Sequence, residues 1–263
     1  MSSLNNKQRE DYFRMLLKGG EIPAVLYKYC SVERALQILD NHSIMFSSYT
    51  AFNDPFDCAV YIDGNNSSDE WKEYLIQQGL LPLDAECKAH LILENPAEAA
   101  SIVSKAYLRA IKEMGILCLS SINDNILMWS HYSDFHKGVC LRFDVSKDLE
   151  TFNFPLKVIY NNEYIKLNYI QSYLRNDQDM HIALWHKSKD WEYENEYRII
   201  DSVEHGLKTF KKEALTGIVF GCQCSDENRN KIKEKIREVS YLNIALMEAV
   251  KSKTQYKLEI NTL

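Results

Sequence analysis

Short apolar runs alternate with amphipathic segments near the start of the chain. A helix is predicted at residues 1–20, then a strand at 24–29, an amphipathic helix at 31–41 and a second strand at 43–47. Ser31 can cap the second of these helices, because a serine side chain accepts a hydrogen bond from a backbone N–H of the first turn. The chain therefore opens with a helix followed by a strand–helix–strand unit.

The pattern changes to helical spacing over the more polar residues 64–114. Within this stretch Asn95 can cap a helix, Pro96 suits the first helical position, and Glu98 completes a capping box. Strands are predicted again on the far side. We therefore interpret residues 64–114 as a helical insertion in a single domain that spans residues 1–263.

The second half of the chain contains both segments with the two-residue period of strands and segments with the 3.6-residue period of helices. The fold class that follows is α+β, with a mixed or antiparallel sheet surrounded by helices. The predicted strands are 116–121, 139–144, 156–160, 191–200 and, as the last core strand, 216–221; the predicted helices are a short one around MWSHY, a long stretch at 163–187, and a surface helix at 225–239.

Composition narrows the functional classes. The chain has 263 residues, 46% of them hydrophobic, which is enough for a sizeable core. Its net charge of −6 gives no overall electrostatic footprint for duplex nucleic acid, although a local basic groove is compatible with it. No signal-peptide pattern and no long apolar run is present, so we expect a cytoplasmic protein without membrane contact. Oligomeric state cannot be read from the sequence.

The segment WEYENEYRII, residues 191–200, carries its charges in an unusual arrangement. As a strand it places Glu192, Glu194 and Glu196 in a row on one face, with Arg198 next in line, and the aromatic residues on the other. The aromatic face is expected to be the packed one. The acidic face then either lies in water, with Arg198 and a neighbouring lysine such as Lys187 offsetting its charge, or lines a cleft in which crowding separates the carboxylate pKa values.

Two aromatic motifs are further candidates. In LYKY, Tyr27 and Tyr29 share one face of a strand and Lys28 takes the other. Such a pair is either core packing or a platform for a flat ring. In MWSHY, His131 lies on a short helix beside Tyr132, where a lone histidine is either a packing residue or a catalyst.

The segment AFNDPFD is predicted to be a stiff turn, because Asn, Asp and Pro favour tight backbone bends. Asn53, Asp54, Phe56 and Asp57 are its structural residues, and an aspartate or asparagine side chain among them is expected to accept backbone N–H bonds that hold the turn. A metal site is the alternative, but no cluster of further ligands supports it, and we expect no metal.

LYKY, FNDPFD, MWSHY…GVCLRFD and WEYENEYRII occur in this order. Together they resemble a bacterial family known only as a domain of unknown function, number twenty-nine seventy-one. The resemblance spans roughly residues 24–221 and implies no function by itself.

A strand bearing an aromatic residue, a helix with the pattern VERALQIL and a second strand also resemble the opening of ADP-ribosyltransferase-like domains. Those domains end with a strand that carries a catalytic glutamate, often as Glu-x-Glu, which Glu194-Asn195-Glu196 matches. The resemblance implies that Glu196 orients the ribose of NAD and stabilises an oxocarbenium-like transition state. It implies that Glu194 positions the acceptor and that Tyr27 or Tyr29, with Tyr132, flanks the nicotinamide. His131 of the MWSHY helix is a further catalytic candidate.

The sequence departs from that family in two places. Tyr-Lys-Tyr stands where such enzymes present histidine or arginine, and no Ser-Thr-Ser strand is found. A divergent site in which Lys28 or Arg198 holds the pyrophosphate is one interpretation, and loss of activity is the other. The candidate cofactor-binding residues are Tyr27, Lys28, Tyr29, Trp129, Ser130, Tyr132 and Arg198.

The leading hypothesis is an NAD-consuming transferase that modifies a protein or nucleic-acid acceptor, as a toxin or phage-defence effector. It requires the acidic row that begins at Glu192 to face a pocket shared with Tyr27 and Tyr29. A non-catalytic module whose acidic face docks a basic partner is the main alternative. A metal-independent nuclease that uses His131 and Glu196 is a third.

Overall fold

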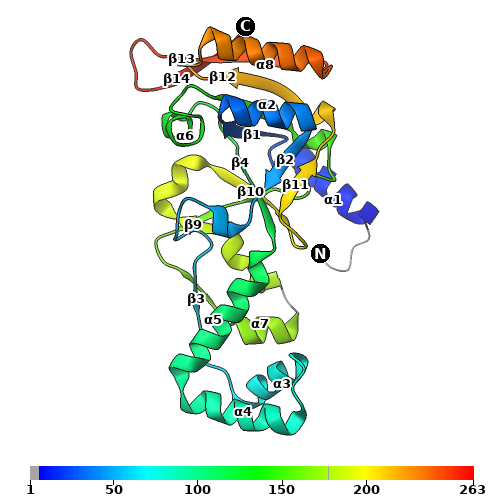
Figure 1. The fold of residues 1–263 in the computed structure, drawn as a ribbon, viewed down its shortest axis with the longest axis vertical. Helices are drawn as coiled ribbons and strands as arrows, with labels where there is room; N and C mark the ends of the chain where they lie inside the picture. The colour runs from blue at the N-terminus through cyan, green and yellow to red at the C-terminus, as the bar shows by residue number, and fades with distance from the viewer. Residues whose placement is uncertain (1–5, 177) are drawn as a thin grey trace.

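A computed structural model describes residues 6–176 and 178–263 (Figure 1). The centre of this part of the chain is a mixed sheet in the strand order β14-β13-β12-β5-β1-β4-β10-β6. Neighbouring strands are antiparallel except β12 and β13, which are parallel. The α+β class with a mixed sheet is thereby confirmed. The strands are β1 (Val25–Cys30), β4 (Gly115–Ser120), β5 (Val139–Asp144), β6 (Leu156–Lys157), β10 (Glu196–Asp201), β12 (Leu215–Phe220), β13 (Ala245–Lys251) and β14 (Leu258–Thr262).

The opening unit forms as its pattern predicts. Helix α1 (Asn6–Gly19) leads into β1, although residues 1–5 of the predicted helix lie outside the described residues. Ser31 caps α2 (Val32–Asn41) by accepting a hydrogen bond from the Arg34 N–H. The following strand, β2 (Ser43–Phe46), pairs with β11 (Gly206–Thr209) in a separate small sheet. The apolar stripe of α2 and the inner side of α8 (Asp226–Glu238) pack onto one continuous core with the central strands.

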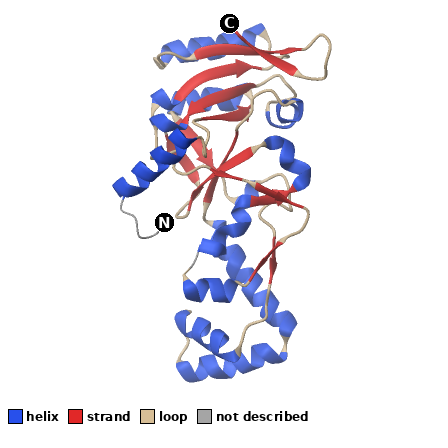
Figure 2. Ribbon diagram, turned by 180° about the vertical axis from the view of Figure 1, so that it is seen from behind, coloured by secondary structure: helices blue, strands red, loops and turns tan. Residues whose placement is uncertain are grey.

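The helical insertion extends away from the sheet and forms one end of the elongated molecule (Figure 1, Figure 2). It contains α3 (Ser68–Gln77), α4 (Pro82–Glu94) and α5 (Pro96–Lys112), and it shares a second core with α7 (Tyr169–Arg175). Asn95 caps α5 by accepting from the Glu98 N–H, as predicted. The Glu98 carboxylate contacts the Asn95 side-chain amide, however, so the capping box is only half formed. None of the described helices combines the length and apolar character that crossing a bilayer requires.

Three predictions for the second half of the chain were wrong. The strand at 156–160 is divided into β6 and β7 (Ile159–Asn161). The helix at 163–187 is broken into β8 (Ile165–Leu167), α7, a 3-10 helix (Gln178–Trp185) and β9 (His186–Ser188), because Asn168 caps α7 and Asn176 ends it in a left-handed conformation. Strand β12 is not the last: α8 crosses over to β13, and β14 returns beside it. Strands β3 (Val60–Ile62) and β8 pair in a further small sheet.

Candidate functional site

The central strands bring three distant segments together. Tyr27 on β1 is paired with Ser120 on β4, and Ser120 is paired in turn with Glu196 on β10. A cavity of about 360 Å³ opens over this junction. Residues from the aromatic motifs, the turn and the acidic segment line it together: Tyr27, Lys28, Tyr29, Asn53, Asp57, Ser120, His131, Tyr132, Lys187, Glu194 and Glu196 are among them. The expected pocket therefore brings the tyrosines together with Glu194 and Glu196, but Glu192, the first residue of the predicted acidic row, does not line it.

The acidic segment does not form the single strand predicted for residues 191–200. Its first part belongs to a 3-10 helix (Lys189–Glu194), Asn195 adopts the left-handed conformation with φ 45°, and β10 begins only at Glu196. Asparagine tolerates this conformation better than most residues. Glu192 consequently leaves the row and is exposed, whereas Glu194 and Glu196, on either side of Asn195, both reach the cavity.

The predicted burial of the two faces was also wrong. The charged side chains are the buried ones: Glu194 is 3% exposed, Glu196 4% and Arg198 0%. Trp191 and Tyr193, by contrast, are only partly buried. The alternative in which the carboxylates of this segment lie in water is therefore wrong for Glu194 and Glu196. The burial is made tolerable by ion pairing, because a charge removed from water is stable only with a partner and hydrogen bonds.

Arg198 is fully occupied by its neighbours. Its Nε and one terminal nitrogen donate to the two oxygens of Glu196, at 2.8 and 3.1 Å. The same terminal nitrogen lies 2.7 Å from Asp57, and the other donates to the Leu184 carbonyl at 2.9 Å. Because the guanidinium is buried and does not line the cavity, it is not placed to hold a pyrophosphate. The prediction of Arg198 as a cofactor-binding residue is corrected to a structural role.

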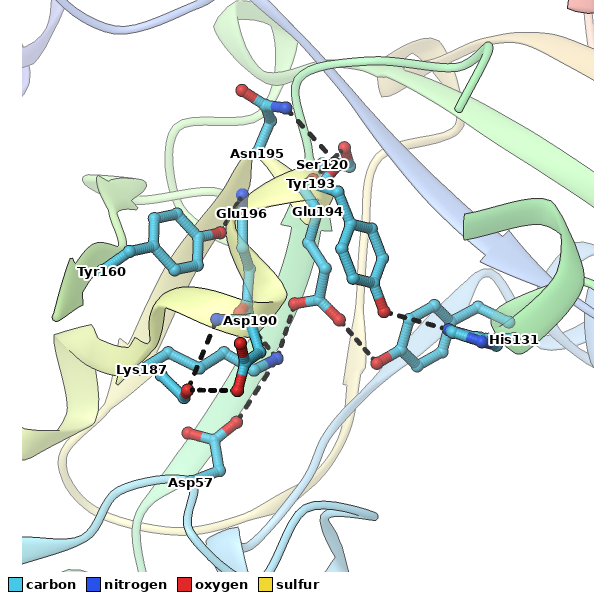
Figure 3. Close-up of polar contacts among 12 residues, drawn as sticks. Asp57, Ser120, His131, Tyr160, Lys187, Asp190, Tyr193, Glu194, Asn195 and Glu196 are labelled. Carbon is cyan, nitrogen blue, oxygen red and sulfur yellow. Dashed lines mark hydrogen bonds and ion pairs between the residues drawn. The ribbon is translucent and has the colours of Figure 1, made fainter. Parts of the chain in front are cut away.

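Lys187 is the second buried cation, and it comes from β9. Its Nζ lies 2.5 Å from Glu194, 3.4 Å from Glu196 and 3.5 Å from Asp57. Figure 3 shows the lysine reaching between these carboxylates. The prediction that Lys187 is an ion-pair partner for the acidic segment is confirmed. We call Asp57, Lys187, Glu194, Glu196 and Arg198 the buried charge cluster; with all five ionised it holds three negative and two positive charges.

The two glutamates of the cluster have different electrostatic environments. Burial would raise the pKa of Glu196, but Arg198 and then Lys187 outweigh it and lower that pKa to about 2. Glu196 is therefore a fixed anion. Burial raises the pKa of Glu194 above its ordinary value of 4.5, Lys187 opposes this effect, and the charge of Glu196 adds to it. Glu194 is the carboxylate whose protonation the site leaves adjustable.

Polar neighbours hold Glu194 in place. The Tyr132 hydroxyl donates to Glu194 Oε1 at 2.6 Å, while Lys187 holds Oε2. Ser120 donates to the backbone carbonyl of Glu194 at 2.6 Å. Tyr160 accepts a hydrogen bond from the Glu196 backbone N–H at 2.9 Å. Sequence reasoning missed Ser120 and Tyr160, because their roles arise from strand pairing and no local motif marks them.

The remaining predicted cofactor-binding residues divide into two groups. Tyr27, Lys28, Tyr29 and Tyr132 line the cavity. The Lys28 Nζ donates to the Cys118 carbonyl at 2.9 Å, and the Tyr29 hydroxyl donates to the Ile122 carbonyl at 2.9 Å. Trp129 and Ser130 are not among the lining residues. Trp129 is fully buried, packs edge-on against Tyr29 and donates to the Asn123 carbonyl, so its position is that of a core residue.

His131 lies at the rim of the cavity. It is exposed, and its Nδ1 is 3.0 Å from the Tyr193 hydroxyl. Figure 3 shows Tyr193 between this histidine and the Glu194 backbone. His131 is therefore a hydrogen-bonded side chain at the surface of the site and not a residue packed in the core. Its predicted role as a catalyst stays a prediction.

The FNDPFD segment is a turn, and one of its residues has a larger role. Asp54 accepts from the Phe56 N–H at 2.9 Å, as predicted for an aspartate that holds a bend, and the Phe56 side chain is 62% exposed. Asn53 lines the cavity. Asp57 is 9% exposed and belongs to the buried charge cluster, which its place in a turn motif did not indicate. No described group of three His, Cys, Asp or Glu side chains is arranged to hold a metal.

One comparison with known proteins found a match. Residues 128–199 are similar to the family described as protein of unknown function (DUF2971). The match covers MWSHY and most of the acidic segment, but not LYKY or FNDPFD, so it is narrower than the resemblance over residues 24–221. No curated protein and no solved structure matched.

Proposed function

We propose that the cavity is the active site of an enzyme that breaks the N-glycosidic bond of NAD and transfers or hydrolyses the ADP-ribosyl group. The observation that carries this proposal is the convergence of Tyr27, Ser120 and Glu196 on three adjacent strands, with Glu194 facing the same cavity. Its volume of about 360 Å³ is within the range of small-molecule sites, roughly 300–1,000 Å³.

The chemistry needs an ionised carboxylate beside the ribose. Positive charge develops on the sugar as nicotinamide departs, and a preorganised carboxylate in a water-poor site stabilises that charge. Glu194 is the better candidate for this role, because one of its oxygens is bound only by the Tyr132 hydroxyl. Glu196 has both oxygens bound by Arg198, and we assign it to positioning. This assignment reverses the roles that the Glu-x-Glu resemblance implies for the two residues.

The aromatic wall suits a flat ring. Tyr27 is half-buried on the cavity wall, and a tyrosine ring beside a planar, electron-poor nicotinamide is a favourable contact. Lys28 brings a positive charge to the same wall, suited to a phosphate. A role as a toxin or phage-defence effector stays a prediction.

The experiment measures nicotinamide release from labelled NAD by the purified protein, with and without cell lysate. Glu194→Gln should lower the rate by at least about 100-fold. The matched control is Glu192→Gln, which removes an exposed carboxylate from the same segment and should keep the rate within about twofold. Full activity in Glu194→Gln, or no turnover by the wild-type protein under either condition, would reject the proposal.

The alternative of a module that docks a basic partner stays untested, but the burial and internal pairing of both cavity glutamates favour the enzyme. The nuclease hypothesis for His131 and Glu196 stays untested. RNA cleavage in the presence of EDTA that is lost in His131→Ala would favour it over NAD chemistry.

A further inference from the structure

A second cavity lies between the start of α6 (Ile126–Tyr132) and the hairpin formed by β13 and β14. Figure 1 shows this hairpin extending beside α6, and Figure 2 shows the same neighbours from behind. The cavity measures about 660 Å³. The hairpin loop, with sequence KSKTQYK at residues 251–257, forms one wall, and Ile126, His136, Cys222 and Gln223 form the other.

The charge of this cavity is positive. Lys251, Lys253 and Lys257 line it and are exposed, and no aspartate or glutamate is among the lining residues. Within the described part of the chain, none of the three lysines forms an ion pair with a carboxylate. The acids nearest to these lysines along the chain, Glu248 and Glu259, also lie outside the lining. In a protein of net charge −6, this is a local concentration of unpaired positive charge.

The loop is held by a rigid base. Leu258 and Ala249 of the hairpin are buried in one apolar cluster with Met128 and Trp129 of α6. The opposite wall is fixed by a hydrogen bond from the Gln223 N–H to the His136 carbonyl, at 3.0 Å. The lysines therefore project from a fixed frame, so ordering them costs less than ordering a free tail.

Tyr256 adds an aromatic surface among the lysines. Its side chain is fully exposed in the same loop, with no ring contact in the described structure. Exposed lysines beside one exposed ring match the needs of single-stranded nucleic acid, whose phosphates bind lysine while its bases stack on aromatic side chains. The loop contains no Leu, Ile, Phe or Trp that would insert into a membrane.

We propose that the cavity between α6 and the β13–β14 hairpin binds the phosphate backbone of single-stranded nucleic acid, with Tyr256 stacking on a base. Helix α6 has seven residues, about 10 Å in length, and also carries Tyr132 of the first cavity. A nucleic-acid strand bound in the hairpin cavity would therefore be separated from the cavity of Glu194 by about the length of α6. If the proposed function holds, nucleic acid is the class of acceptor that receives the ADP-ribosyl group. Binding of nucleic acid does not itself depend on that function.

The experiment measures fluorescence polarisation of labelled oligo(U) and oligo(dT) twelve-mers with the full chain, without NAD, at 50, 100 and 200 mM salt. Each phosphate contact on a single strand contributes about 0.7 to the slope of log affinity against log salt. The variant Lys251→Gln/Lys253→Gln/Lys257→Gln should therefore flatten that slope by about 2. Tyr256→Ala should weaken binding by about fivefold or more, and Tyr256→Phe should preserve it.

The matched control is Lys88→Gln/Lys105→Gln/Lys112→Gln, three exposed lysines of the helical insertion that give the same change in net charge. It should bind like the wild-type protein. Equal loss in both triple variants, absence of oligonucleotide binding, or binding to phosphatidylserine vesicles in place of oligonucleotides would overturn the proposal.

Glu194→Gln should bind the oligonucleotides normally, because its site is separate. Binding without NAD turnover would then reject only the proposed function, and turnover without binding only this inference.

Discussion

The molecule holds two concentrations of charge with opposite solvation, the buried charge cluster and the lysines of the β13–β14 hairpin. In the first, the side chains are at most 9% exposed, and every charge has an opposite charge within 4 Å. In the second, Lys251, Lys253 and Lys257 are exposed and unpaired by carboxylates in the described structure. Helix α6 contributes to both cavities: its first residue, Ile126, lines the hairpin cavity, and its last, Tyr132, lines the cavity of the buried charge cluster.

The difference shows that solvation decides what the same residue types can do. A buried lysine or arginine is committed to its partners, because removing one partner leaves an uncompensated charge in a low-dielectric environment. Such residues fix the geometry of a site. An exposed lysine contributes little to folding and remains available to an external anion. The predictions below test this contrast.

The largest effect is expected from Arg198→Met. The substitution leaves Glu196 and Asp57 without the guanidinium that pairs both, so the free energy of unfolding should fall by about 3–5 kcal/mol. Urea unfolding followed by circular dichroism measures it. The control is Arg14→Met, which breaks an exposed pair with Glu10 and should cost about 0.5 kcal/mol or less. Similar losses of unfolding free energy in the two variants would mean that burial does not make the ion pairs of the cluster more important for stability than exposed pairs.

The second effect concerns acid stability. The pKa of Glu196 is lowered from 4.5 to about 2 in the folded protein, so its contribution is present above pH 4.5 and is lost as pH falls towards 2. The depression corresponds to about 3 kcal/mol. Glu196→Gln should therefore destabilise the protein much more at pH 6 than at pH 3, as measured by urea unfolding at both values.

Glu10→Gln is the control for that experiment, since Glu10 is exposed. It should change stability little at either pH. A Glu196→Gln penalty that is the same at pH 6 and pH 3 would contradict the assignment of Glu196 as a fixed anion.

The smallest effect is expected from Tyr132→Phe. It removes the hydroxyl that donates to Glu194, which should cost about 1 kcal/mol in stability. Because that hydrogen bond favours the ionised carboxylate, its loss raises the pKa of Glu194 further. The acid limb of the pH profile for nicotinamide release should then move to higher pH. Tyr61→Phe, which changes an exposed ring, should leave both stability and profile unchanged.

Local signals in the sequence predicted the local structure well. Serine before an amphipathic helix correctly predicted the cap at Ser31, and the asparagine–proline pair correctly predicted the start of α5. The prediction that Glu194, Tyr27 and Tyr132 belong to one pocket also agrees with the structure. These features depend on hydrogen bonds and spacing within a few residues, which a sequence displays directly.

Predictions from sequence periodicity failed where contacts between distant residues determined which side chains are buried. The rule that polar residues face outwards assigned the wrong buried face to residues 191–200, because it contains no information on the cations that Lys187 and Arg198 bring to the carboxylates. The strand prediction failed at Asn195 because a single left-handed residue ends the alternation. Strand β13 and the edge strand β14 were missed, since each is half-exposed and has little apolar periodicity.

The sequence by itself determined the α+β class, the position of the helical insertion and the tyrosines and glutamates that line the cavity. Only the tertiary structure decided which glutamate is a fixed anion, that Arg198 is structural, and that the hairpin lysines face a cavity. The physical reason is that pKa, burial and ion pairing depend on which distant side chains converge. That convergence is set by the strand order β1-β4-β10 and by the crossover from β12 to β13.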